Sequence, residues 1–403
     1  MTAVFKPSQA KGKLQAPSSR SIAHRLILYA GLCEEESVIR NVAFSPDILT
    51  TVSCLQEMGA QCSRDGSTLR IKGINPLLRK KAVAFDCASF NSTLGFMLPI
   101  AMASGKKAVF EGESSLFERS YDVCRKVCEA HKIKFKKSSS RIAVHGSLKK
   151  GDYNVLGSES SHFISGLIYA LALIDGKSRI FITPPIDGRN YIDLTVKVLA
   201  GQGVDVSWSG QSMVVVNGGK KFTPLDLDIE GDWSSAAYFE AFNAIGGEVE
   251  LEGLSDGSVQ NDVIYPELFR QLREDESPEI NIADNPDLAP ILFVYAALNR
   301  GATFRGLNRF KPKEKLCIEK LAKELSKLNV FLALGDETAI INKSLVKPSS
   351  TPVSANGDHR AVMALAVLLS NVGGALEGAE VIDGFVPQYY DKLSEIGIEF
   401  RKK

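Results

Sequence analysis

The sequence predicts a chain of the α/β class, arranged as two domains that each contain three copies of one repeated unit. Its 403 residues exceed the roughly 250–300 residues at which a single core stops growing, so two domains are expected. One pattern, a serine or aspartate before an apolar run that ends near glycine, occurs six times. Amphipathic stretches and short β-type runs fill the intervals. Helices and strands therefore alternate along the chain, which is typical of α/β folds.

The six apolar runs predict six buried helices. Serine or aspartate before such a run is a helix N-cap signal, and glycine after it is a stop signal. Successive starts are about 70 residues apart with one shorter interval, which indicates repeated supersecondary units. The runs are apolar nearly all round, so we expect their helices to be buried. The starts are Ser21, Ser92, Ser161, Ser234, Asp287 and Asp358, and the expected buried helices follow them over 26–30, 94–103, 163–174, 236–245, 288–298 and 361–369.

Each interval adds an outer helix and strands. Mixed polar and apolar faces predict outer helices over 48–58, 121–131, 192–199, 263–272, 314–328 and 389–396. Alternating β-type residues predict strands over 68–71, 108–110, 141–144, 179–182, 213–216, 248–251 and 338–341. No disordered linker interrupts the chain, so we expect short joints between the domains near 13–18 and 225–230.

Composition excludes several classes of function. The net charge of +1 gives no long-range field for nucleic acid or a membrane surface, and no apolar run approaches the roughly 18 residues of a membrane span. The seven cysteines are odd in number and form no Cys-x-x-Cys pair. We therefore expect free thiols in a reducing cytoplasm and no structural metal.

The stretch at 17–25 indicates an anion site. Ser21 and its neighbouring serines precede the first apolar run, together with Arg20 and Arg25. A helix N-terminus with two arginines beside it suits an anion. The alternative is an ordinary capped core helix with two solvated arginines. If all six capped ends converge on one cleft, the ligand should be a polyanion with phosphate and carboxylate groups.

The capped starts also carry a family resemblance. Six segments resemble, in order and spacing, motifs of the enolpyruvyl transferases, most closely the 5-enolpyruvylshikimate-3-phosphate synthases. These segments are 16–25, 158–166, 230–237, 286–290, 313–314 and 358–360.

The resemblance implies a two-domain enolpyruvyl transferase fold (inverse α/β barrel) of six βαβαββ units, three per domain. Residues 19–229 would form one domain, and 1–18 with 230–403 the other, with the active site in the interdomain cleft. The implied reaction transfers the enolpyruvyl group of phosphoenolpyruvate to the 5-hydroxyl of shikimate 3-phosphate and releases phosphate, on the way to chorismate and aromatic amino acids. The implied protein is a cytoplasmic monomer that needs no metal or organic cofactor.

The resemblance also assigns site residues by position. Asp287 would take the proton of the acceptor hydroxyl, Lys313 would lie near the reacting oxygens, and Glu314 would shuttle a proton. Shikimate 3-phosphate would be bound by Arg20, Ser21, Arg25, Ser160, Ser161, His162, Tyr191, Asp287 and Lys313. Phosphoenolpyruvate would be bound by Arg20, Asn91, Arg119, His162, Glu314 and Arg360.

Each of these assignments has a plainer structural alternative. Asp287 and Asp232 stand where a helix N-cap is expected, so either carboxylate could serve only its helix. Lys313 and Glu314 alone would read as a solvated pair. We interpret His24 as a satisfied structural group rather than a base.

The sequence departs from the family pattern at several of these positions. On the phosphoenolpyruvate side, Cys317 and Gly95 stand where the family has arginine, Gly384 where it has lysine, and Asn91 where it has glycine. On the shikimate side, His162 replaces glutamine and Gly188 replaces serine. Three hypotheses stay open: a divergent synthase, an enolpyruvyl transferase with another anionic acceptor, and a weakly active paralogue that binds a metabolite or a partner.

Overall fold

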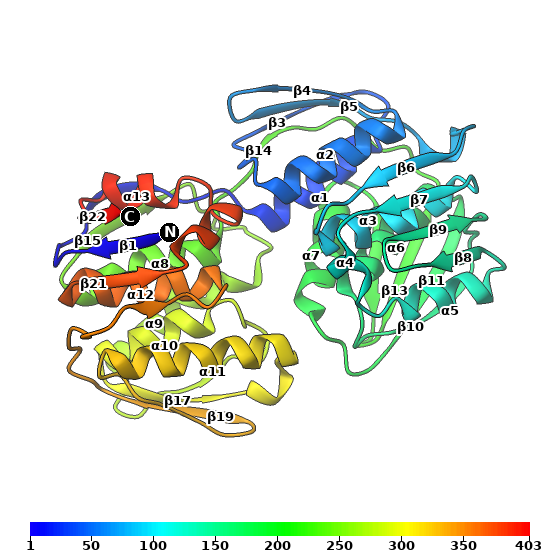
Figure 1. Cartoon of the computed structure of the whole chain (residues 1–403). Coiled ribbons are helices and arrows are strands. Elements are labelled where there is room, and N and C mark those ends of the chain that lie inside the picture. Colours follow the sequence, from blue (N-terminus) through cyan, green and yellow to red (C-terminus); the bar gives the residue numbers. More distant parts are fainter. The chain divides into compact units, whose positions relative to one another are not determined.

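The computed structural model describes residues 1–403 and divides into two compact units. Unit 1 consists of Met1–Ser19 and Glu230–Lys403, and unit 2 consists of Arg20–Ile229. The chain therefore passes from unit 1 into unit 2 and back again, so that both termini belong to unit 1 (Figure 1). Each unit is described separately below.

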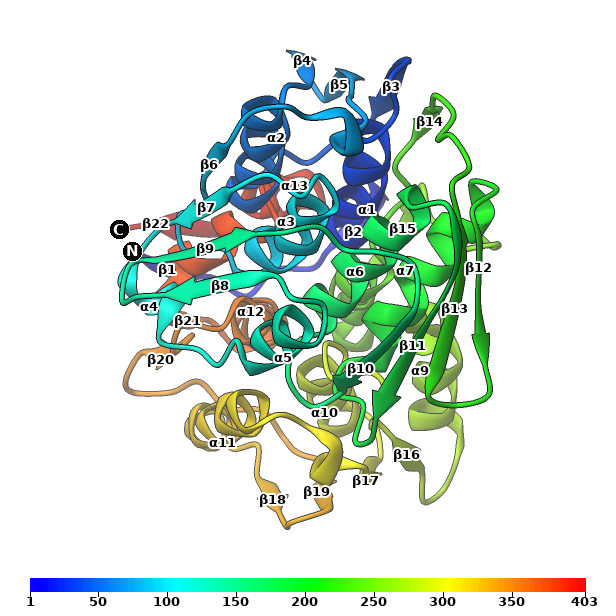
Figure 2. The ribbon, with the colours of Figure 1, turned by 90° about the vertical axis from the view of Figure 1, so that its right-hand side faces the viewer.

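Unit 2 contains three four-stranded sheets of one design. Their strand orders are β14-β3-β5-β4, β6-β7-β9-β8 and β10-β11-β13-β12. The four strands of the third sheet lie side by side in Figure 2. The first pair of each sheet is parallel and the remaining pairs are antiparallel. The strands are β3 (Glu36–Arg40), β4 (Gln61–Asp65), β5 (Thr68–Lys72), β6 (Val83–Asp86), β7 (Ala108–Glu111), β8 (Lys134–Lys137), β9 (Arg141–His145), β10 (Asp152–Leu156), β11 (Gly176–Thr183), β12 (Asp205–Ser209), β13 (Met213–Gly218) and β14 (Asp226–Asp228).

Three helices of unit 2 are buried and the others lie outside them. The buried helices are α1 (Arg20–Gly31), α3 (Asn91–Ala103) and α6 (Ser161–Leu173). Outer helices are α2 (Pro46–Met58), α4 (Ser114–Phe117), α5 (Asp122–Ala130) and α7 (Arg189–Gly201). The order strand, buried helix, strand, outer helix, two strands is the repeated unit expected from the sequence.

Unit 1 repeats the design with strands from both ends of its chain. Its sheets have the orders β20-β21-β1-β22, β15-β2 and β16-β17-β19-β18. The N-terminal strand β1 is antiparallel to both β21 and β22, and β2 is parallel to β15. The strands are β1 (Thr2–Phe5), β2 (Lys11–Gln15), β15 (Glu248–Glu252), β16 (Glu279–Asn281), β17 (Gly301–Arg305), β18 (Leu332–Leu334), β19 (Thr338–Asn342), β20 (Val353–Ser354), β21 (Gly374–Glu377) and β22 (Phe400–Lys402).

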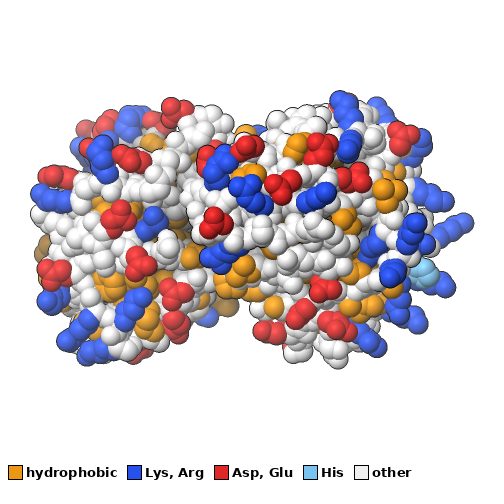
Figure 3. All heavy atoms as spheres, turned by 90° about the horizontal axis from the view of Figure 1, so that it is seen from above, with side chains coloured by type: hydrophobic (Ala, Val, Ile, Leu, Met, Phe, Trp, Pro, Cys, Tyr) orange, Lys and Arg blue, Asp and Glu red, His pale blue; other side chains and the backbone are white.

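The core of unit 1 surrounds three apolar helices, α8 (Trp233–Glu240), α10 (Ala289–Leu298) and α12 (His359–Val372). Outer helices are α9 (Tyr265–Glu274), α11 (Pro312–Lys327) and α13 (Tyr389–Glu395). All six helices predicted to be buried are therefore present and buried, and the α/β prediction is confirmed. No helix in either unit has the length and apolarity needed to cross a membrane. Charged side chains of both signs are scattered over the face seen in Figure 3, among hydrophobic and other side chains.

The N-cap predictions are confirmed at three helices. The side chains of Ser160, Asp232 and Asp358 accept hydrogen bonds from the backbone N–H groups of Phe163, Ser235 and Arg360. Each bond satisfies one of the free N–H groups at a helix start.

Three cap predictions are wrong. Ser21 lies inside α1, which begins at Arg20. Helix α3 begins one residue before Ser92, with Phe90 at the cap position and no side-chain cap. Thr93 instead lies inside the first turn. Helix α10 has Leu288 at its cap position without a side-chain cap, because a turn from Asn285 to Leu288 leads into the helix. Asp287 is therefore not the N-cap of this helix.

Candidate functional site

Unit 2 holds a buried cation whose hydrogen-bond partners are all neutral. Arg25 lies on α1, whose apolar residues carry it into the core, and it is only 2% exposed. Its guanidinium donates to the Thr195 hydroxyl (2.8 Å) and to the carbonyl oxygens of Ser21 (2.7 Å) and Tyr191 (2.6 Å). The Phe96 ring lies 5.6 Å away. No carboxylate neutralises this charge.

That arrangement suits an anionic ligand. Burial lowers the pKa of Arg25 to about 10, so the side chain stays charged at neutral pH. Charged side chains are rarely buried unless they are paired, because removal from water is costly. The buried cation is therefore the strongest anion-binding feature of unit 2, and it is one of the residues that the sequence singled out.

Arg20 belongs to a second network at the start of the same helix. Its guanidinium lies 3.4 Å from the Asp47 carboxylate, which also lies 3.1 Å from His24 Nε2. Burial raises the pKa of Asp47, but the His24 hydrogen bond and the Arg20 charge outweigh it and hold that pKa far below its usual range. The other ring nitrogen of His24 contacts the Thr51 hydroxyl at 3.2 Å. The interpretation of His24 as a satisfied structural group is confirmed, whereas the sequence did not reveal Asp47.

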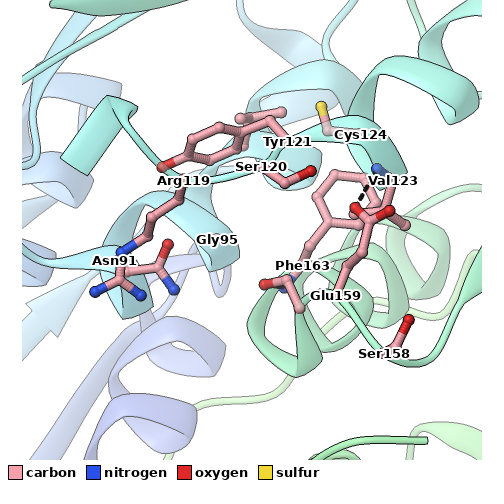
Figure 4. Close-up of a pocket in the computed structure, with 12 residues that line it drawn as sticks. Asn91, Gly95, Arg119, Ser120, Tyr121, Val123, Cys124, Ser158, Glu159 and Phe163 are labelled. Carbon is pink, nitrogen blue, oxygen red and sulfur yellow. Dashed lines mark hydrogen bonds between the residues drawn. The ribbon is translucent and has the colours of Figure 1, made fainter. Parts of the chain in front are cut away.

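A pocket of about 270 Å³ brings together Asn91, Arg119 and Ser160. Asn91 is the first residue of α3, and Ser160 is the N-cap of α6. In Figure 4 the Arg119 side chain extends toward Asn91. Across the pocket, the Glu159 carboxylate accepts a hydrogen bond from Val123 N at the start of α5 (2.6 Å). The pocket thus contains one cation, one carboxylate and several neutral donors.

The remaining predicted residues of unit 2 lie on α6 and α7. Ser161 is buried as the first residue of α6. His162 follows it, with its ring 5.4 Å from the Phe96 ring and 6.4 Å from the Tyr191 ring. The Tyr191 carbonyl is the oxygen that accepts from Arg25. Tyr191 therefore borders the buried cation, and His162 packs against the Tyr191 and Phe96 rings.

Close packing of α3 against α6 leaves no room for an arginine at position 95. A Cβ atom on Gly95 would lie 2.6 Å from the Cβ of His162, closer than real contacts allow. Helices α3 and α6 are closely packed here, since a Cβ on Gly166 would lie 2.5 Å from the Phe96 carbonyl oxygen. No arginine fits at position 95 unless these helices move apart.

In unit 1, Asp287 is paired with Arg360. The Arg360 guanidinium donates to the Asp287 carboxylate at 3.0 Å and, through Nε and Nη2, to both oxygens of Asp358 at 3.0 Å. Burial lowers the pKa of Arg360, but the two carboxylates outweigh it and raise that pKa well above its usual value. The expected clamp arginine therefore already has two carboxylate partners. The Tyr238 hydroxyl donates to the Asp287 carbonyl oxygen at 2.8 Å.

Glu314 and Lys313 occupy the first turn of α11. One Glu314 oxygen accepts from Lys311 N (2.8 Å) as part of a capping box, while Lys313 is exposed. Glu314 lines a small enclosed cavity together with Cys317, Asp358 and Arg360. Burial and the Asp358 charge raise the pKa of the Cys317 thiol, so a neutral group stands where the family has arginine.

The predicted residues thus form two sets. Unit 2 brings Ser21 and Tyr191 into contact with Arg25 and places Asn91, Arg119 and Ser160 at one pocket. Unit 1 gathers Asp287, Arg360 and Glu314. Sequence reasoning did not single out three carboxyl groups near these residues: Asp47, which contacts Arg20; Glu159, which lines the pocket; and Asp262, which lies near Asp287. Asp47 and Asp262 each lie in the first turn of a helix, where acidic residues are favoured, but this signal does not mark a site residue.

Known proteins share this fold. Two solved EPSP synthase structures from Acinetobacter baumannii match with TM-scores of 0.82 and 0.83 at 19% identity and cover 100% of both chains. The enolpyruvyl transferase NikO from Streptomyces tendae matches with a TM-score of 0.75 at 13% identity, covering 99% of this chain and 98% of that one. The fold is therefore the one that enolpyruvyl transferases adopt.

Sequence comparison identifies the family. The model of EPSP synthase (3-phosphoshikimate 1-carboxyvinyltransferase) matches residues 4–393. The 3-phosphoshikimate 1-carboxyvinyltransferase of Clostridium kluyveri is 31% identical, with 98% of this chain and 96% of that protein covered. The enzyme of the same name from Clostridium acetobutylicum is 30% identical, with 97% and 96% covered. The chain belongs to the EPSP synthase family.

Proposed function

We propose that this protein transfers the enolpyruvyl group of phosphoenolpyruvate to the 5-hydroxyl of shikimate 3-phosphate and releases phosphate, as a step toward chorismate. Family membership supports the reaction class. The observation that carries the proposal for this chain is Arg25, a buried cation with neutral partners only. A carboxylate or phosphate of the acceptor supplies the missing negative charge.

The reaction divides its work between the two sets of residues. Arg25 and the serines at the start of α6 hold the anionic acceptor, because backbone N–H groups and a guanidinium favour phosphate and carboxylate oxygens. Asp287 takes the proton from the acceptor hydroxyl while Lys313 and Glu314 serve the reacting oxygens and the methylene carbon. We propose that both sets act on one pair of substrates in an interdomain cleft, since neither set alone supplies both binding and proton transfer.

The donor side of the site is weakened in this chain. Arg360 must exchange a carboxylate partner for the carboxylate of phosphoenolpyruvate, and Cys317 supplies no charge to compensate. Each lost charge-assisted hydrogen bond is worth about 1.5–3 kcal/mol. Phosphoenolpyruvate therefore binds much more weakly than shikimate 3-phosphate.

Other properties belong to the same proposal. The ligands are small molecules rather than nucleic acid or membrane, no metal or organic cofactor takes part, and the protein works as a monomer. We place it in the cytoplasm, in keeping with seven cysteines that are all free thiols.

A product assay tests the proposal. The protein is incubated with shikimate 3-phosphate and phosphoenolpyruvate, and both phosphate release and the mass of the product are followed. Enolpyruvylated product should require both substrates. Arg25→Met should weaken acceptor binding by roughly 10- to 150-fold, whereas Arg141→Met, at an exposed arginine of the same unit, should leave it unchanged. Absence of product under all conditions would contradict the proposal.

A second candidate is an enolpyruvyl transferase with a different anionic acceptor. Two positions on the acceptor side favour it. His162 replaces glutamine next to Tyr191, and Gly188 has φ 68°, where the serine expected from the family would be strained. The same assay with shikimate or UDP-N-acetylglucosamine in place of shikimate 3-phosphate distinguishes the two. Binding without turnover of any acceptor would favour the weakly active paralogue.

A further inference from the structure

Asp262 is a buried carboxyl group that the proposed reaction does not use. It lies in the short helix η3 (Asn261–Ile264) before α9 and is 7% exposed. One oxygen accepts from the Asn285 side-chain amide at 2.7 Å, and the other accepts from the Ser234 hydroxyl. Both donors are neutral. The carboxyl group is therefore satisfied by hydrogen bonds but not by a cation.

These two bonds join Asp262 to the segment that carries Asp287. Asn285 lies two residues before Asp287, and its carbonyl oxygen accepts from Leu288 N. Ser234 lies in the first turn of α8, the helix whose Tyr238 hydroxyl bonds the Asp287 carbonyl oxygen. Asp262 and Tyr238 thus tie the turn before α10 to α8. The position of the Asp287 carboxylate depends on both ties.

Asp262 also faces other carboxyl groups. Burial raises its pKa most, the neighbouring Asp287 raises it further, and Asp232 adds a smaller increase. The hydrogen bonds from Asn285 and Ser234 act in the opposite direction, and the resulting pKa is about 7. The charged groups nearest to Asp262 are Asp232 at the start of α8 and Asp287 in the turn before α10. Asp287 in turn contacts Arg360, and Arg360 contacts Asp358.

We infer that Asp262 is a positioning residue for Asp287, holding its turn through Asn285 and setting by its own charge how strongly Asp287 attracts a proton. The inference rests on the proposed function, in which Asp287 accepts the hydroxyl proton. When Asp262 ionises, its negative charge disfavours the Asp287 anion, and Asp287 becomes a stronger base. When Asp262 is protonated, that effect disappears while both hydrogen bonds remain possible. Turnover should therefore rise as Asp262 ionises.

The pH dependence of kcat tests this inference. Wild type should show kcat rising with pH through about 7. Asp262→Asn keeps the shape of the protonated side chain, with one donor group and one acceptor group, so the protein should fold. The variant should lose the rise in kcat and have a kcat about 3- to 10-fold below that of wild type at pH 8. Asp256→Asn makes the same charge change at an exposed position of unit 1 and should keep the wild-type profile. An Asp262→Asn variant that retains the rise would overturn the inference.

Ser234→Ala provides a second test that needs no loss of charge. Removing the hydroxyl removes a hydrogen bond that lowers the pKa of Asp262, so the rise in kcat should move to higher pH. A purely structural role of Asp262 would change the level of kcat and leave the position of the rise unchanged.

A measurement without turnover separates failure of this inference from failure of the proposed function. Carboxyl ¹³C resonances followed by NMR should reveal one aspartate that titrates near pH 7 and is absent in Asp262→Asn. Its midpoint should fall in Asp287→Asn, because a neighbouring negative charge has been removed. If no carboxyl group titrates above pH 6, or if Asp287→Asn leaves the titration midpoint unchanged, Asp262 and Asp287 are not coupled, whatever reaction the protein catalyses.

Discussion

At the scale of single residues, the two units treat their arginines differently. Arg25 is buried among neutral acceptors and keeps its charge available. Arg360 is more exposed, with 13% of its side chain accessible, and already bonds two carboxylates. An anion adds charge compensation at the first arginine and must displace a partner at the second. Shikimate 3-phosphate and phosphoenolpyruvate should therefore bind with different affinities, even though a guanidinium is proposed to bind each of them.

Asp287→Ala tests the assigned base. Because Asp287 does not cap α10, the substitution should leave the helix intact. Loss of a positioned base lowers rates by about 10²- to 10⁴-fold, so turnover should become undetectable while shikimate 3-phosphate still binds. The measurement is kcat together with calorimetric binding of the acceptor. Unchanged turnover would show that Asp287 only holds Arg360.

At the scale of elements, the sequence predicts those helices and strands whose formation depends on a local residue pattern. The buried helices could be predicted because their apolar runs are long and end at glycine. Strands such as β1 and β2 could not, because they are short and their partners β21 and β15 lie far along the chain. The prediction of Ser92 as the start of α3 was also wrong, because the helix begins at Asn91 and no side chain caps it.

The same limit applies to the site. Residues within motifs, such as Arg25 and Asp287, could be named from the sequence because residue type and spacing are visible there. Their partners could not. Nothing in the sequence indicates that Arg360 bonds Asp287 or that Asp262 lies beside Asp287, because these contacts join segments that are separated along the chain.

Replacing glycine by alanine should affect stability differently at Gly95 and at Gly384. Gly95→Ala places a Cβ 2.6 Å from the His162 Cβ between packed helices, whereas a Cβ on Gly384 meets nothing within 4 Å. Overpacking of a core contact costs about 1–3 kcal/mol. Urea denaturation should show that loss of unfolding free energy for Gly95→Ala and little change for Gly384→Ala. Equal stability of the two variants would mean that α3 and α6 are not closely packed at this point.

At the scale of the whole molecule, buried carboxyl groups make stability depend on pH with two opposite signs. The pKa of Asp262 is raised from 3.8 to about 7 by burial and neighbouring carboxylates. The unfolded chain ionises this group first, so its contribution to stability falls as pH rises from about 4 to about 7. The pKa of Asp47 is lowered, so its contribution is present above about pH 4 and is lost as pH falls.

These signs can be measured with matched variants. Relative to wild type, Asp262→Asn should gain unfolding free energy steadily between pH 4 and pH 7. The loss caused by Asp47→Asn should stay constant over the same range and shrink only in more acidic solution. Denaturant titrations at several pH values provide the comparison. If the difference in unfolding free energy between Asp262→Asn and wild type does not change with pH, a raised pKa for Asp262 is contradicted.

The central claim is that the protein keeps the acceptor side of an EPSP synthase site and has weakened the donor side. Calorimetric titration tests it most directly: shikimate 3-phosphate is added first, and phosphoenolpyruvate is then added to the saturated protein. Shikimate 3-phosphate should bind alone, and phosphoenolpyruvate should bind far more weakly. The double variant Cys317→Arg with Gly384→Lys should strengthen the second step by a few kcal/mol at most, about 1.5–3 kcal/mol for each restored charge-assisted bond. Micromolar binding of phosphoenolpyruvate to wild type with no gain in the double variant, or no binding of shikimate 3-phosphate at all, would contradict the account.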